Sequence, residues 1–395
     1  MKITIVNGFF LPVPPLSGGA TEKSWYQLAR KFAAKGHQVT TISRRWPGLP
    51  DEEIHEDIRH LRLRGYDHKR KLWQNLLLDF LWSWQVFFAL PRADVVIVNA
   101  VALPMWLGWL KPRAGKVVLM TGRMPKGQYR RYRAIARVLA PSSFVRDKVL
   151  EENPALAPVA RVTGYPINWN LLNQPGTTTS PFPSDSGQDQ ICVGFIGRIH
   201  EEKGVLLLAE AMQFVAQAPG LPAWRLLVCG PSDIARGGSG SLFRTQLLNR
   251  ISAALPANRF QLLDPQFNER TLAGVYRRIN IFCYPSLAGQ GETFGVAVAE
   301  AMAAGAVPVV SRLACFADFV RDGENALTFD HTAPDAAQQL AGAIIRLLRE
   351  PGLRQQLAVA AQDSVRRFDY ARYAATLLED FKQLTVPANS PSSSS

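Results

Sequence analysis

The chain has 395 residues, 47% of them hydrophobic, which excludes an intrinsically disordered protein and allows about two domains. Its net charge of +13 comes from residues 1–175, which hold 26 Lys and Arg against 12 Asp and Glu. This excess favours an anionic partner, such as a membrane surface, an anionic substrate or a nucleic acid, unless the basic face is simply solvated. The four cysteines lack metal or redox spacing, so we expect them to be reduced and buried.

In the first half of the chain, short runs typical of β-strands alternate with helical patterns. Residues 2–10 (KITIVNGFF) predict a strand and lack the features of a signal peptide, so we expect a cytoplasmic protein. Apolar side chains then recur at helical spacing in residues 18–37. Further strands are predicted at 38–45, 58–66, 93–100, 116–123 and 136–143. Their Val, Ile and Leu runs are typical of a parallel sheet covered by helices on both faces.

Residues 72–90 are long and apolar enough to suggest a transmembrane helix. However, Asp79 lies in the middle of the segment, where a charge costs on the order of 2.5–3.5 kcal/mol in a bilayer. The segment also lies between two predicted parallel strands, which require a crossover connection. We therefore expect a mostly buried crossover helix in which Asn75, Asp79 and Ser83 form a narrow polar stripe. A membrane-facing helix beside the basic residues 68–71 is the alternative.

The composition changes after residue 172. Residues 173–190 are rich in Pro, Gly, Ser and Thr and predict a linker, while residues 385–395 predict a disordered tail. Strands are predicted again at 191–197, 224–230, 259–264, 279–286, 306–311 and 326–330. We therefore predict an α/β protein with two Rossmann-like domains facing a cleft. The domains are residues 1–172 and 191–384, and the last helix is able to pack back on the first domain.

The loop 197–204 (GRIHEEKG) follows a predicted strand, at the edge where α/β sheets bind ligands. Gly197 allows the backbone to approach a ligand closely. Arg198 offers a planar fork and Lys203 a mobile point charge, which suits two linked phosphates. The alternative is two ordinary surface cations near the glutamates of the same loop.

A second group of candidate residues lies in 291–311 (GETFGVAVAEAMAAGAVPVVS). Phe294 and Gly295 begin a short predicted helix, whose free N–H groups can receive an anion. Glu292 and Glu300 suit sugar hydroxyls, because a carboxylate only accepts hydrogen bonds. Glu300 stands among small apolar residues, where an unpaired carboxylate is costly, so a core glutamate paired with a cation is the alternative.

These motifs and their order resemble the GT4-type (group 1) glycosyltransferases of the GT-B fold, over nearly the whole chain. The resemblance implies that residues 1–172 bind the acceptor and residues 191–384 bind a nucleotide-diphosphate-sugar donor. It also implies transfer with retention of configuration, with no protein nucleophile, no essential metal and no cofactor. No nucleic acid is expected as a partner.

The resemblance further implies roles for individual residues. Arg198 and Lys203 stabilise the charge that grows on the leaving diphosphate, and with Glu292 they are the expected catalytic residues. The expected donor-binding residues are Glu292, Phe294 and Gly295 for the donor sugar and phosphate, Glu300 for the ribose, Gly197 for close backbone approach, and Gly18 and Gly19 from the opposing domain.

The acceptor side departs from the family pattern. Relatives often carry a His near Asn99 and another in the loop 120–128, and this chain has neither. Acceptor contacts are instead expected from Asn99, Thr121, Arg123 or Lys126. The acceptor itself is unassigned, lipid-linked or anionic, and the basic first half suggests a peripheral position on an anionic inner membrane face. A sugar-nucleotide epimerase of the same architecture, or a basic membrane- or nucleic-acid-binding protein that has lost catalysis, are the alternative functions.

Overall fold

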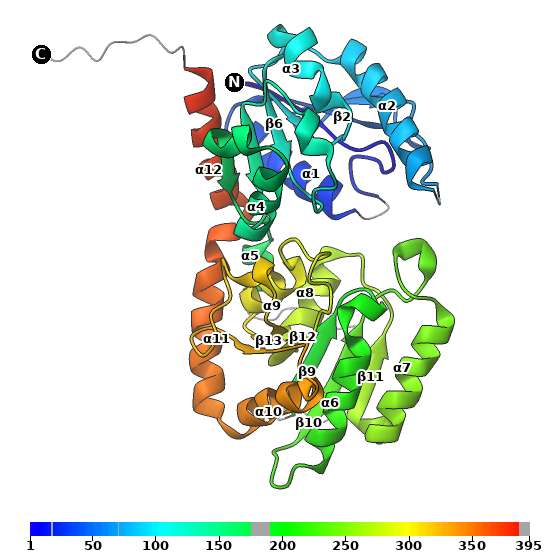
Figure 1. The fold of residues 1–395 in the computed structure, drawn as a ribbon, viewed down its shortest axis with the longest axis vertical. Helices are drawn as coiled ribbons and strands as arrows, with labels where there is room; N and C mark the ends of the chain where they lie inside the picture. Colours follow the sequence, from blue (N-terminus) through cyan, green and yellow to red (C-terminus); the bar gives the residue numbers. More distant parts are fainter. Residues whose placement is uncertain (17–18, 70, 175–189, 387–395) are drawn as a thin grey trace, which may run out of the picture. The chain divides into compact units, whose positions relative to one another are not determined.

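The computed structural model describes residues 1–16, 19–69, 71–174 and 190–386. The chain divides into two compact units (Figure 1). Unit 1 comprises Met1–Pro166 and the segment from Tyr370 onward, and unit 2 comprises Ile167–Asp369. Each unit is an α/β structure built on a mainly parallel sheet, which confirms the predicted fold class. Most of the predicted linker and the tail from residue 387 lie outside the described residues.

In its described part, unit 1 has an eight-stranded sheet in the order β3-β4-β2-β1-β5-β6-β7-β8. The strands are β1 (Lys2–Val6), β2 (Gln38–Arg44), β3 (Glu52–His55), β4 (Ile58–Leu63), β5 (Val95–Val98), β6 (Lys116–Met120), β7 (Arg137–Ala140) and β8 (Ala160–Val162). β3 pairs with β4 in an antiparallel hairpin, and the other described pairs are parallel. The sequence did not predict β3 or β8, because both are short and mostly exposed.

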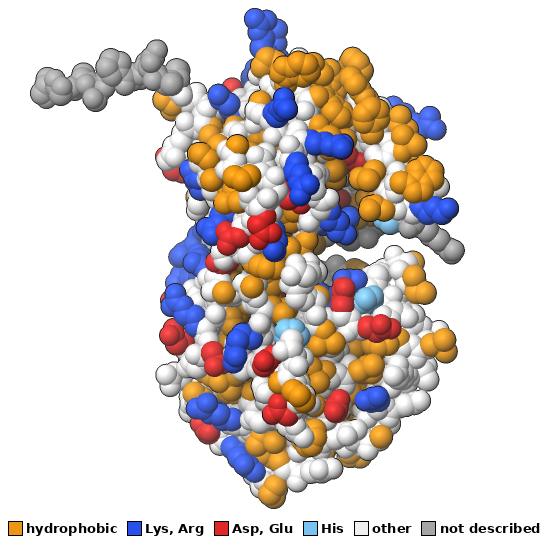
Figure 2. All heavy atoms as spheres, in the orientation of Figure 1, with side chains coloured by type: hydrophobic (Ala, Val, Ile, Leu, Met, Phe, Trp, Pro, Cys, Tyr) orange, Lys and Arg blue, Asp and Glu red, His pale blue; other side chains and the backbone are white. Residues whose placement is uncertain are grey.

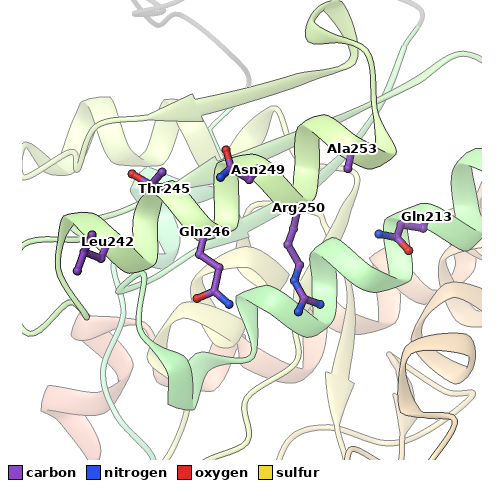
Figure 3. A pocket seen from close by; sticks show the side chains of 7 residues that line it. All are labelled: Gln213, Leu242, Thr245, Gln246, Asn249, Arg250 and Ala253. Atoms are coloured by element: carbon purple, nitrogen blue, oxygen red, sulfur yellow. The ribbon is translucent and has the colours of Figure 1, made fainter.

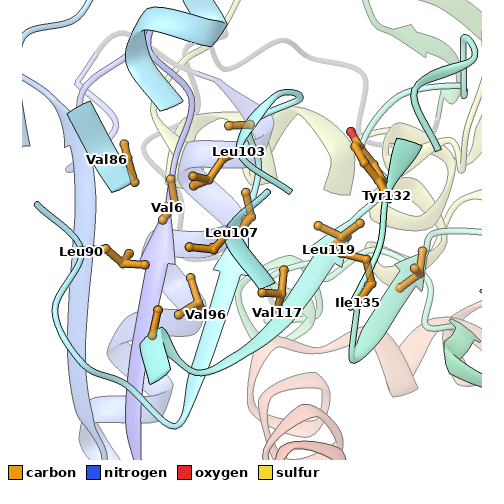
Figure 4. Close-up of a cluster of buried hydrophobic side chains, with 14 of the residues drawn as sticks. Val6, Val86, Leu90, Val96, Leu103, Leu107, Val117, Leu119, Tyr132 and Ile135 are labelled. Carbon is orange, nitrogen blue, oxygen red and sulfur yellow. The ribbon is translucent and has the colours of Figure 1, made fainter. Parts of the chain in front are cut away.

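Helices cover both faces of this sheet. They are α1 (Ala20–Ala34), α2 (Leu72–Ala89), α3 (Leu107–Leu110), α4 (Ser143–Glu152) and α12 (Tyr370–Thr385). Alternate residues of each central strand face opposite cores: Val95 packs with α1 and α12, whereas Val96 packs with α2 and α3. Figure 4 shows this second core, in which Val86 of α2 and Leu107 of α3 meet the strand residues. This arrangement explains the nearly continuous apolar strand sequences.

α2 is the predicted crossover helix between β4 and β5, but the expectation that it is mostly buried is wrong. The predicted polar stripe points inward, since Asp79 and Ser83 are buried. Asp79 accepts hydrogen bonds from the backbone N–H groups of Val101 and Ala102, the shortest at 2.7 Å. Trp82 and Val86 are buried on the same side. Most other large apolar side chains face outward, and the exposed ones are Leu72, Trp73, Leu76, Leu77, Phe80, Leu81 and Phe88. Among the described residues, no helix is long and apolar enough to cross a bilayer.

In its described part, unit 2 has a six-stranded parallel sheet in the order β11-β10-β9-β12-β13-β14. The strands are β9 (Ile191–Ile196), β10 (Trp224–Cys229), β11 (Phe260–Leu263), β12 (Ile281–Tyr284), β13 (Val307–Ser311) and β14 (Leu327–Phe329). The helices are α5 (Trp169–Leu172), α6 (Val205–Gln217), α7 (Ser241–Ala254), α8 (Glu269–Arg277), α9 (Val296–Ala303), α10 (Ala336–Arg349) and α11 (Pro351–Val365). The four cysteines lie in this unit, buried and unpaired, as expected.

Each sheet has a topological switch point, a pair of neighbouring strands from which the order of the strands runs outward to both sides. In unit 2 the strands run outward from β9 through β10 to β11, and then from β12 through β13 to β14 on the other side. In unit 1 the corresponding neighbours are β1 and β5. Open α/β sheets bind ligands outside the carboxyl ends of the two strands at such a point. Candidate sites are therefore expected after β9 and β12 in unit 2, and after β1 and β5 in unit 1.

Candidate functional site

The loop after β9 is joined to the loop after β12 by direct contacts. Gly204 has a φ of +66°, and a Cβ on this residue would lie 1.8 Å from the carbonyl oxygen of Pro285. The Leu287 N–H donates a hydrogen bond to the carbonyl oxygen of Glu202 at 2.8 Å. Only glycine fits this close approach in this backbone conformation. The second glycine of the predicted motif therefore fixes one loop against the other.

Gly197, at the end of β9, is held close to the end of β10. Its N–H donates to the carbonyl oxygen of Cys229 at 3.0 Å. A Cβ on Gly230 would lie 1.8 Å from the carbonyl oxygen of Gly197. The backbone at Gly197 thus lies in close contact with the end of β10. The loop that carries Arg198 and Lys203 begins at this residue.

Arg198 stays partly open to solvent, with 41% of its side chain exposed. One guanidinium nitrogen donates to the carbonyl oxygen of Gly237 at 2.8 Å, and another lies 2.6 Å from Glu202 Oε1. These contacts orient the guanidinium fork at the carboxyl end of β9. The planar group is therefore positioned in advance, and its partly exposed side can bind an anion.

Lys203 is buried and paired, so the expectation of a mobile point charge is wrong. Its Nζ lies 2.7 Å from Glu292 Oε2, and the two side chains are only 9% and 11% exposed. The same oxygen accepts hydrogen bonds from the Tyr284 hydroxyl at 3.2 Å and the Ser286 hydroxyl at 3.4 Å. Burial, and then the charge of Glu292, raise the pKa of Tyr284 well above its usual value, so its hydroxyl keeps its proton and donates. Two residues predicted separately thus form one buried network.

At the start of α9, only the backbone of the predicted residues is available to a ligand. The ring of Phe294 is 1% exposed and packs against Phe319 and Phe368, with centroid distances of 4.8 and 5.1 Å. Gly295 has a φ of +81°, and a Cβ there would lie 2.4 Å from a ring carbon of Phe316. Binding through the N–H groups of this helix start therefore stays a prediction, while the side chain of Phe294 belongs to the core.

Glu300 lies on α9 and is oriented by a neighbouring helix. The hydroxyl of Tyr276, on α8, donates a hydrogen bond to Glu300 Oε2 at 2.9 Å. Burial, and then Glu300, raise the pKa of Tyr276 well above its usual value, which keeps this hydroxyl protonated. The sequence did not single out Tyr276, because α8 and α9 come together only in the folded unit.

Unit 1 has a pocket of about 230 Å³ at the carboxyl ends of β1 and β5, where the topological switch point predicts one. Of the four predicted acceptor-side residues, Asn99, Thr121 and Arg123 line it, whereas Lys126 is not among its lining residues. Asn99 accepts from Trp25 Nε1 at 2.9 Å and donates to the Val6 carbonyl at 3.0 Å. Its amide therefore braces the wall of the pocket.

The candidate residues of unit 1 differ in how far they are exposed. Thr121 is 2% exposed and accepts a hydrogen bond from the Tyr129 hydroxyl at 2.8 Å, whereas Arg123 and Lys126 are exposed. Gly19 precedes α1, and Gly18 lies outside the described residues. The pocket also contains carboxylates from Glu22 and Asp79, which were not predicted as site residues.

A larger groove, of about 550 Å³, lies on the outer helices of unit 2. The side chains of Gln246 and Arg250 extend from α7, and Gln213 belongs to α6 (Figure 3). All the lining residues belong to α6 and α7, and none comes from the loops that follow β9 and β12. The residues that carry the predicted chemistry do not line it, so the candidate site remains at the strand ends.

Known proteins share both the sequence pattern and the fold. The family model of group 1 glycosyl transferases matches residues 177–364, and that of glycosyltransferase family 4 matches residues 18–162. A phosphatidyl-myo-inositol mannosyltransferase of Mycobacterium tuberculosis is 28% identical over 97% of each chain. A D-inositol 3-phosphate glycosyltransferase of Xylanimonas cellulosilytica is 27% identical over 82% of this chain and 75% of its own length.

A solved structure supports the same fold. Anabaena HepE, in complex with UDP and glucose, matches with a TM-score of 0.71 and 17% identity, and the match covers 97% of this chain and 100% of HepE. This likeness shows the fold alone. With the two family models, which together span most of the chain, it shows that the protein belongs to the group 1, GT4-type glycosyltransferases of the GT-B fold.

Proposed function

We propose that this glycosyltransferase moves a sugar, with retention of configuration, from a nucleoside-diphosphate sugar to a polyhydroxylated, anionic acceptor. The observation that carries the donor half is the set of Arg198, Lys203 and Glu292 at the carboxyl ends of β9 and β12. Two cations there suit a diphosphate, and UDP is the nucleotide with which HepE was solved. The names of two relatives, a phosphatidyl-myo-inositol mannosyltransferase and a D-inositol 3-phosphate glycosyltransferase, support the acceptor class.

In the proposed reaction, the bond between the anomeric carbon and the diphosphate oxygen breaks. The acceptor oxygen forms the new bond to that carbon, the electron pair of the broken bond leaves with the diphosphate, and the departing diphosphate oxygen takes up the acceptor's proton. Arg198 and Lys203 stabilise the negative charge as it grows, which lowers the barrier more than it tightens donor binding. Glu292 Oε2 already accepts three hydrogen bonds, so Glu292 is better suited to holding groups in place than to acting as a nucleophile.

The test is an assay for free nucleoside diphosphate with a panel of sugar nucleotides, chosen first by thermal shift. A true donor at 100 times its Kd should stabilise the protein by about 2.7 kcal/mol. We expect slow release of nucleoside diphosphate without acceptor. Conversion of the donor into an epimer would instead favour the epimerase alternative. If no sugar nucleotide stabilises the protein, the alternative of a binding protein that has lost catalysis is favoured.

We predict that Glu300→Gln weakens donor binding through the ribose, because an amide accepts less well than a carboxylate and adds a donor. A hydrogen bond to a charged group contributes about 1.5–3 kcal/mol. Calorimetry with the donor and its 2′-deoxy analogue measures the effect, and Tyr276→Phe should show a smaller loss, since it removes the group that orients Glu300. A Glu300→Gln protein that prefers the ribose as strongly as the unmodified protein would assign this glutamate a structural role.

We further propose that the acceptor is met at an anionic membrane face, where the outer face of α2 contacts the lipid. Figure 2 shows hydrophobic side chains gathered over α2 and α3. Trp109 and Leu110 of α3 add to the exposed apolar side chains of α2. Exposed Lys69 and Lys71 precede α2 and Arg92 follows it, so cations flank the apolar surface. Apolar surface bordered by Lys and Arg is suited to an anionic bilayer.

Vesicle co-sedimentation tests this proposal. We expect binding to anionic but not neutral vesicles, and its loss at high salt, since each Lys or Arg near the surface contributes about 1 kcal/mol. The double variant Trp73→Ser/Leu77→Ser should lose binding, whereas Val359→Ser, an exposed apolar change on α11, should keep it. If the unmodified protein stays off both vesicle types at low salt, the membrane proposal fails and the basic surface is left to an acidic acceptor or to no partner.

A further inference from the structure

Each of the two cations at the candidate donor site is accompanied by a carboxylate. Lys203 Nζ lies 2.7 Å from Glu292 Oε2. Arg198 lies 2.6 Å from Glu202 Oε1, so the charges of these four groups cancel. The first pair is buried, where a charge without a partner is costly, and this gives Glu292 a structural reason. The side chains of the second pair are 41% and 37% exposed, so the pair contributes little to stability and Glu202 needs another explanation.

The backbone of Glu202 is held by both loops of the site. Its N–H donates a hydrogen bond to His200 Nδ1 at 3.2 Å, within the loop after β9. Its carbonyl oxygen accepts from the Leu287 N–H at 2.8 Å and from the Ser286 hydroxyl at 3.3 Å, both in the loop after β12. The carboxylate therefore extends from a backbone that the protein itself fixes, without help from a ligand.

The carboxylate of Glu202 lies between the same two loops. Its Oε1 contacts Arg198, and its Oε2 faces the loop after β12, since a Cβ on Gly291 would lie 3.9 Å from that oxygen. The carbonyl oxygen of Gly237 holds the guanidinium of Arg198 from another side, at 2.8 Å. A diphosphate that binds the exposed part of Arg198 consequently comes close to the Glu202 carboxylate, which has the same sign of charge.

The two nucleotides of a glycosyl transfer differ in charge. In a sugar nucleotide both phosphates are esterified, and each carries one negative charge. The released nucleoside diphosphate has a free terminal phosphate, whose last proton dissociates with a pKa of about 6, so the product gains close to one further negative charge above that pH. A carboxylate beside the site therefore repels the product more strongly than the donor.

We propose that Glu202 sets the preference of this site between donor and product, because its carboxylate weakens the binding of the nucleoside diphosphate more than that of the sugar nucleotide. Two cations without carboxylate partners would favour the more highly charged product, and the site would stay occupied after transfer. The inference rests on the proposed function, in which the donor is a nucleoside-diphosphate sugar.

This role is compatible with the stabilisation of the leaving group by Arg198 and Lys203. During transfer, the charge that grows on the diphosphate is balanced by positive charge on the sugar ring. The extra negative charge meets Glu202 only after the sugar has left and the proton taken from the acceptor has dissociated. Glu202 thus acts on product release.

Calorimetry with two pairs of nucleotides, UDP with UDP-glucose and GDP with GDP-mannose, tests the inference. Measurements at about pH 8 without divalent metal ions keep the charge difference between product and donor. We expect Glu202→Gln, which keeps the shape of the side chain, to tighten binding of the nucleoside diphosphate about 10-fold more than that of its sugar nucleotide. Glu201→Gln is the matched control, because it removes the same charge from the adjacent exposed residue, and it should leave the ratio of the two Kd values unchanged.

Glu202→Ala separates the charge of this residue from an orienting effect on Arg198. It should shift the ratio of the Kd values in the same direction as Glu202→Gln, and urea unfolding of both variants should match that of the unmodified protein. An equal loss of affinity for both nucleotides would mean that Glu202 only orients Arg198, and it would overturn the inference. A shift in Glu201→Gln as large as that in Glu202→Gln would overturn it as well, since the general charge of the loop would then suffice.

The same measurements keep this inference distinct from the proposed function. If the unmodified protein binds a nucleotide pair and Glu202→Gln leaves the ratio of the Kd values unchanged, the inference is wrong and the proposed donor class stands. If the unmodified protein binds neither pair, the result counts against the proposed donor class, and the inference fails with it.

Discussion

Replacing Arg198 by alanine is expected to lower turnover about 10²–10³-fold, because one preorganised group that stabilises the leaving diphosphate is lost. The free energy of unfolding should barely change. The side chain is 41% exposed, and its ion pair with Glu202 is of the surface type that contributes about 0–1 kcal/mol. Initial rates with saturating donor and urea unfolding measure the two quantities on the same preparation.

Two variants sharpen this comparison. Arg198→Lys keeps the charge but loses the fork, so its turnover should fall between those of the unmodified protein and Arg198→Ala. Arg236→Ala removes an exposed arginine from the nearby loop after β10 and should leave turnover unchanged. If Arg198→Ala turns over at a near-normal rate, Arg198 has no part in the donor chemistry.

Lys203→Ala should lose both activity and stability, unlike Arg198→Ala. Removing the ammonium leaves Glu292 buried beside Tyr284 and Ser286 without its cation, and breaking such a pair typically costs about 3–5 kcal/mol. Turnover should fall at least as far as in Arg198→Ala. From its position in a loop, Lys203 would be expected to affect catalysis alone. Its burial with Glu292 adds the expected loss of stability.

The double variant Lys203→Met/Glu292→Gln separates the two effects. It removes both charges together, so much of the lost stability should return, while turnover should stay low. Urea unfolding and the rate of nucleoside diphosphate release give the comparison. Recovery of turnover along with stability would mean that Lys203 only supports the fold.

The sequence predicted most of the fold because the buried strands carry a strong signal. Val95–Val98 and Ile281–Tyr284 lie between helices on both faces, so nearly every residue is apolar. β3 was missed because Glu52–His55 is exposed and gains its place by pairing with β4. For α2, apolar residues surround the whole helix, so its pattern alone could not say which side faces the core.

The site was predictable in its residue types but not in its pairings. Arg198, Lys203, Glu292 and Glu300 stand out as charges among glycines and apolar residues. The pairing of Lys203 with Glu292 spans 89 positions and depends on two loops that meet only at the strand ends. Glu22 was missed because an acidic residue in the first turn of a helix is ordinary, as it suits the helix dipole.

The return of α12 to unit 1 bears on the order of folding during synthesis. Phe381 is fully buried in the core between the unit 1 sheet, α1 and α12. Arg137 pairs with Asp380 at 2.7 Å, and the Tyr373 hydroxyl donates to Thr163 Oγ1 at 2.9 Å. Ile167–Asp369 are made before these contacts exist, so the ribosome releases a complete second unit while the first still exposes the apolar surface that α12 covers. Domains of a nascent chain usually complete their folding in the order in which they are translated. Here unit 2 is complete in the chain before unit 1, because unit 1 requires α12.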